Sequence, residues 1–359
     1  MSSIQSNKRE LKIGNNIIND ASDCYVIAEI GHNHKGDIDI CKQLFDAAKD
    51  AGAQAVKLQK RDNAALYTKA MFNQPYNSEN AYGPTYGTHR EALEFGWDEY
   101  IELKNYAKEL GLDFFSTAFD FNSADFLAKL DLPAVKMASG DLRSLPLLKY
   151  VAQMGKPMII STGGATMEDV VRAYEAIMPI NPQLAILQCT AAYPANFEDL
   201  NLNVIKTYRE TFPDVVVGLS AHDSGISQSV AAYVLGGRIV EKHFTLNRTW
   251  KGTDHAFSLE PVGLKKMVRD LKRTRLSLGD GIKRQLPNEV APILKMGKKV
   301  VTKRPLAAGH VLCADDLTLK SPADGFSPIY FERVLGQQLL KDLPEEADFS
   351  FDDLKPLHD

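Results

Sequence analysis

The segments VVVGLSAHD (215–223) and RIVEKHF (238–244) set the architecture of this chain, because each is a short apolar, β-branched run that ends in a histidine. Runs of this length and composition are typical of buried strands. In α/β barrels, the polar residues just beyond the carboxyl ends of parallel strands carry the chemistry. Two imidazoles at neighbouring strand ends, those of His222 and His243, can share one divalent metal ion. Taken alone, two such histidines are more often ordinary loop or core residues than metal ligands.

The same pattern recurs along the chain, which favours a functional site. Strand-like runs alternate with helical patterns that place apolar residues at i, i+3 and i+4 and often end in glycine, a C-cap signal. Eight such units in about 255 residues predict a parallel (β/α)8 TIM barrel, with a doubly wound sheet as the alternative. The expected strands are Tyr25–Ile30, Ala55–Leu58, Asp113–Thr117, Ala134–Met137, Pro157–Ser161, Leu184–Gln188, Val215–Leu219 and Ile239–Glu241.

Two segments depart from this alternation. Residues 60–96 are rich in Asn, Tyr, Gly and Pro without a period, and a long loop of this kind inside a compact domain predicts a functional lid. After Gly281 a linker-like stretch, KRQLPNEVAP, precedes short strand-like runs with tight-turn residues. We therefore predict a TIM-barrel catalytic domain over residues 1–285 and a small β-rich domain over residues 286–359, which has too few residues to be robust alone.

The composition argues against several classes of function. The 359 residues are 44% hydrophobic with a net charge of −4, and no sizeable basic run indicates nucleic-acid or membrane-surface binding. The four cysteines are scattered without metal-ligand spacing, as in reduced cytosolic proteins. The first residues lack the apolar region of a signal peptide, and no run reaches the roughly 20 apolar residues of a membrane span. We expect a soluble, cytoplasmic protein.

Polar residues at the ends of the expected strands converge on one barrel mouth. Lys57 and Lys136 each close an apolar strand, where the ammonium group cannot easily reach solvent and is expected to meet an anion; the alternative is a salt bridge at the rim. Flanked by Thr117, Ser139 and Ser220, the two lysines favour a phosphate or carboxylate pocket. A Schiff-base aldolase also uses a strand-end lysine. Two lysines facing two histidines fit an anionic substrate beside a metal better.

Eight strings along the chain resemble those of one enzyme family. They are IAEIGHNHKG, AVKLQ, FFSTAFD, VKMASGD, IISTG, QCTAAYP, GLSAHD and EKHFTL, in this order. With these strings the chain closely resembles the sialic acid synthases, the N-acetylneuraminate and N-acylneuraminate-9-phosphate synthases, over nearly its whole length. Residues 286–359 resemble the antifreeze-like domain of that family, which has a β-clip fold.

The resemblance implies an activity, a cofactor and an assembly. The activity is condensation of phosphoenolpyruvate with the open-chain aldehyde of N-acetylmannosamine, or of its 6-phosphate, to give N-acetylneuraminate, or the 9-phosphate, and phosphate. The cofactor is Mn2+ or Mg2+, bound by His222 and His243, and it polarises the aldehyde as a Lewis acid. The assembly is a domain-swapped homodimer, in which the C-terminal domain of one protomer covers the barrel mouth of its partner.

Carried over motif by motif, the resemblance also implies roles for individual residues. Glu29, His222 and Tyr193 are the expected catalytic residues, with Glu29 positioning water or moving a proton. The expected phosphoenolpyruvate pocket consists of Lys57, Thr117, Lys136, Ser139 and Ser220. The expected sugar contacts are Gln59, Asp141, Tyr193 and Asp254.

Several features bear on the identity of the sugar. Ala191 stands where bacterial relatives often carry an asparagine, and Ser321 where they carry an arginine that reaches the sugar. The segments 75–95 and 249–261 look closer to the animal enzymes, which use the sugar 6-phosphate. A 6-phosphate needs cations near the lid, and the segment 60–96 offers Lys60, Arg61, Lys69, His89 and Arg90, which can equally be solvated cations of an exposed loop.

Two further hypotheses remain open at the level of the sequence. The chain can be a synthase for a related acid: KDN, legionaminic or pseudaminic acid. It can also be a carbohydrate-binding protein with an inactive barrel, although a scaffold has no need for two strand-end lysines together with two strand-end histidines.

Overall fold

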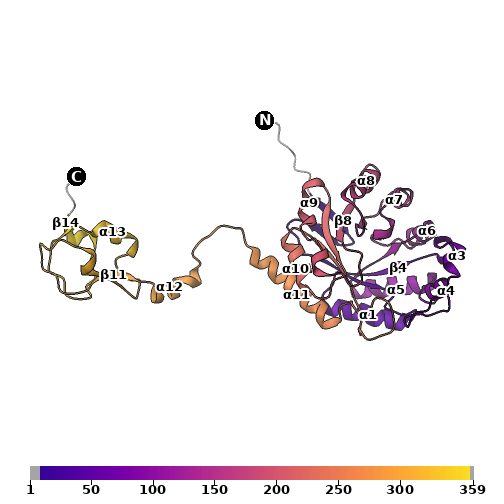
Figure 1. Ribbon diagram of the computed structural model, residues 1–359, viewed down its shortest axis with the longest axis horizontal. Coiled ribbons are helices and arrows are strands. Elements are labelled where there is room, and N and C mark those ends of the chain that lie inside the picture. Colours follow the sequence, from indigo (N-terminus) through magenta and orange to yellow (C-terminus); the bar gives the residue numbers. More distant parts are fainter. Residues whose placement is uncertain (1–8, 356–359) are drawn as a thin grey trace. The chain divides into compact units, whose positions relative to one another are not determined.

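Eight parallel strands close into a barrel in the computed structural model, which describes residues 9–355 (Figure 1). This confirms the predicted (β/α)8 fold and excludes the doubly wound sheet. Strands follow one another around the barrel in chain order, and the last pairs with the first. They are β3 (Tyr25–Gly31), β4 (Ala55–Lys60), β5 (Asp113–Ala118), β6 (Val135–Met137), β7 (Met158–Ser161), β8 (Leu184–Cys189), β9 (Val216–Ala221) and β10 (Ile239–His243).

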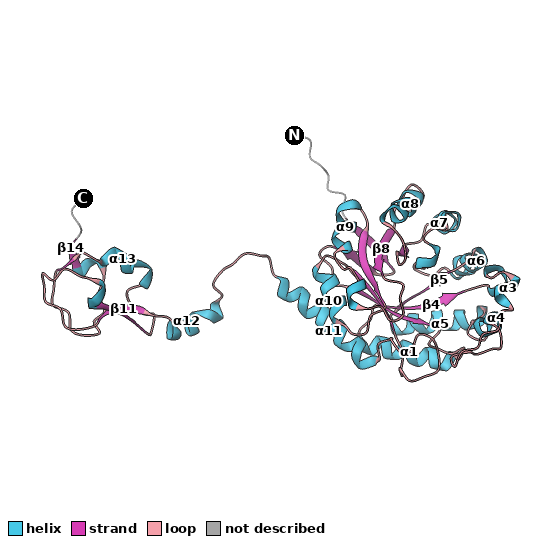
Figure 2. Ribbon diagram, in the orientation of Figure 1, coloured by secondary structure: helices cyan, strands magenta, loops and turns pink. Residues whose placement is uncertain are grey.

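Helices cover the outside of the barrel and explain why its strands are apolar on both faces (Figure 2). The first, α1 (Ile38–Ala51), begins at Asp37, whose side chain accepts two backbone N–H groups, and ends at Gly52 with a φ of 88° that favours glycine. The others are α5 (Trp97–Leu110), α6 (Phe121–Leu130), α7 (Leu145–Ala152), α8 (Met167–Ile177), α9 (Val204–Thr211), α10 (Ser227–Val234) and α11 (Pro261–Leu278). A hairpin of β1 (Glu10–Ile13) and β2 (Asn16–Asn19) precedes the barrel.

The segment 60–96 differs from the predicted structureless loop. It contains three short helices, α2 (Asn63–Leu66), α3 (Lys69–Phe72) and α4 (Tyr86–Glu91). Their N-caps are Asp62, Thr68 and Thr85, whose side chains accept backbone N–H groups of the first turn. Helices of four to six residues are too short to show a 3.6-residue apolar period, and therefore only their caps are visible in the sequence.

The chain divides into two compact units, Met1–Gly279 and Asp280–Asp359. The second has its own small core, in which Val300, Leu317 and Leu339 are buried. Its elements are α12 (Val290–Met296), α13 (Phe331–Val334) and two antiparallel pairs, β11 (Lys299–Thr302) with β12 (Leu317–Lys320) and β13 (Gln338–Leu339) with β14 (Leu354–Lys355). The small antiparallel sheets agree with the predicted β-rich fold. Within residues 9–355, no helix is long and apolar enough to cross a bilayer.

Candidate active site

A cavity of about 510 Å³ lies at the carboxyl ends of the barrel strands. It is lined by Glu29, Lys57, Gln59, Thr117, Lys136, Ser139, Tyr193, Ser220, His222, His243 and Asp254 among the predicted site residues. Asp141 is the exception: it lies in a 3-10 turn (Ser139–Asp141) beside the lining residue Gly140, and burial raises the pKa of its carboxyl to about 6. The structure thus brings the predicted residues together from seven of the eight strands and the loops that follow them.

The parallel register of the barrel joins Lys57 to a carboxylate of the neighbouring strand. Lys57 on β4 is paired in register with Glu29 on β3, and its Nζ lies 2.7 Å from Glu29 Oε2. The same Nζ donates to Thr117 Oγ1 on β5 at 2.9 Å. Gln59 donates from Nε2 to Glu29 Oε1 at 2.7 Å, so both oxygens of this buried carboxylate are contacted.

Lys136 lies on β6, two strands from Lys57, and the ammonium groups of both lysines approach one oxygen of Glu241. Its Nζ donates to Ser161 Oγ at 2.7 Å and lies 3.5 Å from Glu241 Oε1. Ser220 donates to the same Glu241 oxygen at 3.2 Å. Both lysines are 3% exposed or less, and a buried ammonium group requires compensation of this kind. The predicted anion partner of each lysine is therefore supplied in part by the protein itself, deep in the mouth and away from the rim.

The two buried carboxylates differ in their ease of protonation. Burial raises the pKa of Glu29, with Glu241 adding to the effect and Lys57 opposing it. Burial also disfavours the Glu241 carboxylate, but Lys136 and Lys57 together lower its pKa below the usual range. A pair of carboxyl groups shifted in opposite directions is an arrangement for moving protons near neutral pH. Glu241 is the ionised counterion, and Glu29 is the group suited to exchange a proton.

The two histidines face each other across the ends of β9 and β10. The centroids of the His222 and His243 rings are 5.3 Å apart. His222 Nδ1 lies 2.8 Å from the carbonyl oxygen of Thr190, so Nδ1 carries the hydrogen and Nε2 keeps its lone pair for a ligand. His243 Nδ1 is buried without a hydrogen-bond partner among the described residues and lies 3.7 Å from Asp254 Oδ2.

This donor set fits a divalent metal ion that also binds water and substrate. Across residues 9–355, no group of three or more His, Cys, Asp and Glu side chains is arranged to hold a metal. The protein would therefore supply two ligands, His222 and His243. Imidazole nitrogens bind divalent transition metals, and the carboxylates nearby are ligands that suit both Mn2+ and Mg2+. The arrangement leaves coordination positions free for reacting groups.

Two aromatic rings pack against the histidines. The centroid of the Tyr193 ring lies 4.2 Å from that of His222, and Phe257 lies 5.0 Å from His243. Phe257 was not identified from the sequence, because an apolar residue in a loop carries no signal of its own. Burial raises the pKa of the Tyr193 hydroxyl, which therefore stays protonated and can donate a hydrogen bond.

A buried ion pair behind the histidines was also missed. Lys242 Nζ lies 2.9 Å from Asp223 Oδ1 and donates to the Asp223 carbonyl oxygen at 2.5 Å, with both side chains 1% exposed. Asp223 follows His222, and Lys242 precedes His243. The pair therefore ties together the two strand ends that carry the histidines. Its sequence signal is weak, because a charged residue near a strand end is usually solvated.

The five basic side chains of the segment 60–96 differ in location, and only some of them reach the cavity. Arg61 and Arg90 line the cavity. Lys60 instead donates to Glu94 and to the carbonyl oxygen of Phe95. Lys69 is exposed on α3, and the ring of His89 packs against that of Tyr76 with centroids 4.6 Å apart. Only the two arginines can meet a substrate in this cavity.

Comparison with known proteins shows the family to which the chain belongs. Residues 44–283 match the model of the NeuB family, and residues 299–355 match that of the SAF domain. The chain belongs to the NeuB family. It is 41% identical to the N-acetylneuraminate-9-phosphate synthase of Mus musculus over 324 residues, which cover 90% of each protein. It is 34% identical to the N,N'-diacetyllegionaminic acid synthase of Legionella pneumophila, over 89% of this chain and 91% of that protein.

A solved structure gives the same result. The N-acetylneuraminic acid (sialic acid) synthetase of Leptospira borgpetersenii, crystallised in complex with citrate, is 31% identical with a TM-score of 0.68, over 80% of this chain and 95% of that one. The resemblance to sialic acid synthases is confirmed. As a NeuB-family member, the chain is a phosphoenolpyruvate-dependent synthase of nonulosonic acids, in a family of metal-dependent enzymes. The inactive-barrel hypothesis is therefore abandoned.

Proposed function

We propose that the chain condenses phosphoenolpyruvate with the open-chain aldehyde of N-acetylmannosamine, or of its 6-phosphate, giving N-acetylneuraminate, or its 9-phosphate, and phosphate. The observation that carries this proposal is one cavity in which two lysine–glutamate pairs lie beside two histidines. The 41% identity to an N-acetylneuraminate-9-phosphate synthase supports the choice of sugar.

The phosphoenolpyruvate binds over the two lysines in this proposal. Each ammonium group has three hydrogens. Lys57 gives one to Glu29 and one to Thr117, while Lys136 gives one to Ser161 and faces the Met137 carbonyl oxygen at 3.3 Å. Lys57 then has one hydrogen left for the phosphate or carboxylate of the substrate, whereas Lys136, which also contacts Glu241 at 3.5 Å, contributes its positive charge. The hydroxyl groups of the proposed pocket residues Thr117, Ser139 and Ser220 then orient it.

The chemistry forms a carbon–carbon bond between C3 of phosphoenolpyruvate and the aldehyde carbon, and the aldehyde oxygen takes up a proton. Water then adds at C2 and loses a proton. When the bond from C2 to the bridging oxygen breaks, the new C2 hydroxyl gives its proton to the departing phosphate and becomes the keto group. Glu29, with its raised pKa, is placed to position the water and accept the proton that the water loses. A metal ion held by His222 and His243, Mn2+ or Mg2+, supplies Lewis-acid polarisation of the aldehyde when bound.

The remaining polar residues orient the sugar in this proposal. Gln59 and Asp254 line the cavity next to the histidines, and the Tyr193 ring packs on His222. Glycine is required at position 31 beside Gln59. Its φ of 53° favours glycine, and a Cβ there would lie only 3.1 Å from Gln59 Nε2. Asp141 lies outside the lining of the cavity and contacts the sugar only if the 3-10 turn adjusts.

An acceptor panel tests the proposal. Phosphate release from phosphoenolpyruvate is measured with N-acetylmannosamine, its 6-phosphate, N-acetylglucosamine and mannose, together with mass analysis of the product. Release is expected only with the N-acylmannosamine acceptors, and it should yield a nine-carbon 2-keto-3-deoxy acid in equal amount. Release without any acceptor, or none with any hexosamine, would contradict the proposal.

A synthase for a related nonulosonic acid is the second candidate. It is favoured by the 34% identity to a synthase of N,N'-diacetyllegionaminic acid, which is only a few points below that to the first group of relatives. Turnover confined to acceptors with a second acylamino group would favour legionaminic or pseudaminic acid, and turnover confined to mannose would favour KDN.

We also infer a domain-swapped homodimer, in which residues 286–359 of one protomer complete the site of its partner. The inference rests on the resemblance to sialic acid synthases, and the apolar residues Val311, Ile329 and Leu340 exposed on the C-terminal unit agree with a surface that is covered in an assembly. A truncated chain of residues 1–285 is expected to fold, because the barrel has its own core, and to lose sugar affinity and most activity. Light scattering and the KM for the sugar check this; an unimpaired truncated enzyme or a monomeric full-length protein would overturn it.

A further inference from the structure

Two arginines face the active-site cavity without a carboxylate partner. Arg61 follows β4 and Arg90 lies in α4, and both line the cavity. Arg61 is 8% exposed. Among residues 9–355, no Asp or Glu oxygen lies within 4.0 Å of either guanidinium group. This contrasts with Lys57 and Lys136 in the same cavity, which are paired with glutamates.

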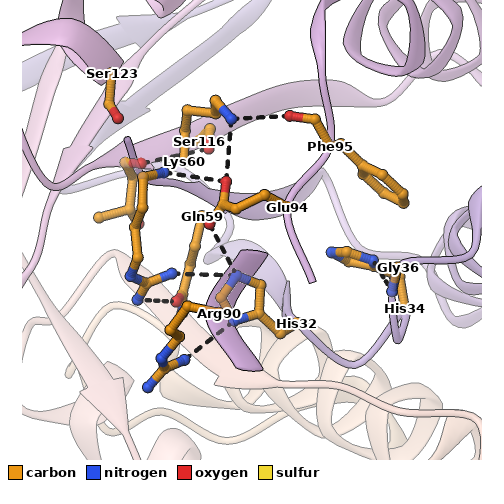
Figure 3. A network of polar contacts seen from close by, with 12 residues as sticks. His32, His34, Gly36, Gln59, Lys60, Arg90, Glu94, Phe95, Ser116 and Ser123 are labelled. Atoms are coloured by element: carbon orange, nitrogen blue, oxygen red, sulfur yellow. Dashed lines mark hydrogen bonds and ion pairs between the residues drawn. The ribbon is translucent and has the colours of Figure 1, made fainter. Parts of the chain in front are cut away.

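The two guanidinium groups instead meet one imidazole ring. Arg61 Nη1 lies 3.2 Å from His32 Nε2, and Arg90 Nη1 lies 3.3 Å from His32 Nδ1. Figure 3 shows the His32 ring between Gln59, Glu94 and Arg90. Arg61 also donates from Nη2 to Gln59 Oε1 at 2.6 Å. Arg90 donates from Nε and Nη2 to the Tyr86 hydroxyl oxygen at 3.2 and 3.0 Å, so both arginines are held by more than one contact.

One histidine cannot satisfy both arginines. A neutral imidazole has a single lone pair and a single N–H, so it accepts a hydrogen bond from only one of them, and a protonated imidazole accepts from neither. Burial and the two positive charges lower the pKa of His32 well below its usual value, which keeps the ring neutral. In either tautomer, at least one guanidinium N–H that points at this ring lacks an acceptor.

The position of the Glu94 carboxylate indicates which of the two arginines lacks an acceptor on the His32 ring. Glu94 Oε1 is buried without a hydrogen-bond partner among the described residues and lies 3.5 Å from His32 Nε2. A hydrogen on Nε2 therefore faces Glu94, and Nδ1 accepts from Arg90. Arg61 Nη1 then has no acceptor. A buried, unsatisfied guanidinium donor is costly unless a ligand supplies an anion.

We propose that Arg61 and Arg90 form a subsite for a phosphate monoester on the acceptor sugar, with His32 as a neutral spacer between them. This rests on the proposed function and names the substrate class of the same site. Two guanidinium forks match the oxygens of a phosphate dianion. Gln59 connects the subsite to the reacting end, because it donates to Glu29 and accepts from Arg61. The aldehyde end of the sugar lies near the histidines, and its phosphate end lies at the arginines.

Kinetics with paired acceptors test this subsite. The variants Arg61→Met and Arg90→Met are compared with Lys69→Met, a matched control that removes an exposed cation of the same segment. Loss of a charge-assisted hydrogen bond typically costs a factor of about 10 to 100. Each arginine variant is expected to raise the KM for N-acetylmannosamine 6-phosphate at least about tenfold more than the KM for the free sugar. The lysine variant should show no such difference.

A binding measurement on the unmodified enzyme covers the case in which the variants fail to fold. The probes are the reduced sugar, N-acetylmannosaminitol, and its 6-phosphate, neither of which has an aldehyde to react. The phosphorylated probe is expected to inhibit at concentrations at least about tenfold lower. Equal inhibition by both probes would overturn the proposal.

The remaining outcomes separate the subsite from the proposed function. Equal effects of the arginine variants on both sugars overturn the subsite, as does an increase confined to the KM for phosphoenolpyruvate, which would assign the arginines to that substrate instead. In both cases continued turnover of the free sugar leaves the synthase activity standing. Failure of every hexosamine acceptor removes the synthase proposal itself.

Discussion

Chelation of divalent ions is expected to abolish turnover, and added Mn2+ to restore it. The reason is the pair of imidazoles at the ends of β9 and β10, whose ring centroids are 5.3 Å apart and whose remaining surroundings supply no third clustered ligand within residues 9–355. A site with two protein ligands holds its ion weakly enough for a chelator to remove it. Full activity in excess chelator would refute the assignment.

Substitution of either histidine should have the same consequence. His222→Ala and His243→Ala are each expected to lower kcat by at least about 100-fold, since Lewis-acid stabilisation amounts to several kcal/mol. Binding of Mn2+, followed by the spin-resonance signal of the free ion, should weaken in parallel. His310→Asn is the matched control, because it removes an imidazole of the C-terminal unit. Unchanged Mn2+ binding in both histidine variants would place the ion elsewhere.

Removing the ammonium group of Lys57 is expected to cost both stability and activity. Glu29 is 1% exposed, and Lys57→Met leaves its carboxylate without the cation 2.7 Å away. Breaking one half of a buried ion pair typically lowers the free energy of unfolding by about 3–5 kcal/mol. Turnover should be lost as well, because a hydrogen-bond donor to phosphoenolpyruvate is removed. Urea denaturation and phosphate release measure the two effects.

A second substitution separates the two consequences. In the double variant Lys57→Met/Glu29→Gln the uncompensated charge is gone, so stability should largely return while activity stays absent. Lys12→Met, which removes an exposed lysine of β1, should change stability by no more than about 0.5 kcal/mol. A Lys57→Met enzyme that is as stable as the unmodified chain would show that the ion pair has another compensation.

The barrel was predictable because its strands are buried on both faces. Such strands appear in a sequence as apolar runs, and all five residues of β10, for example, are buried in the structure. Strand ends were equally visible, so Lys57, Lys136 and the two histidines were located before their partners were known. The three short helices of residues 60–96 were not predicted, since only their caps carry a signal.

What the sequence could not provide was the pairing of charges across the barrel. Glu29 and Glu241 stand out as polar strand ends, but their pairing with Lys57 and Lys136 depends on the register of a closed sheet. The same holds for His32, which is one residue of the string IGHNHKG until the fold brings Arg61 and Arg90 to its two nitrogens. Contacts between residues distant in sequence decided what these groups do.

The fate of the bridging oxygen of phosphoenolpyruvate tests the central claim most directly. In the proposed reaction C3 attacks the aldehyde, water is captured at C2, and the bond between C2 and the bridging oxygen breaks. With substrate isotopically labelled at the oxygen between C2 and phosphorus, turnover with the preferred acceptor sugar should release all of the label in inorganic phosphate. Label retained in the keto acid would mean cleavage between oxygen and phosphorus and would contradict the account.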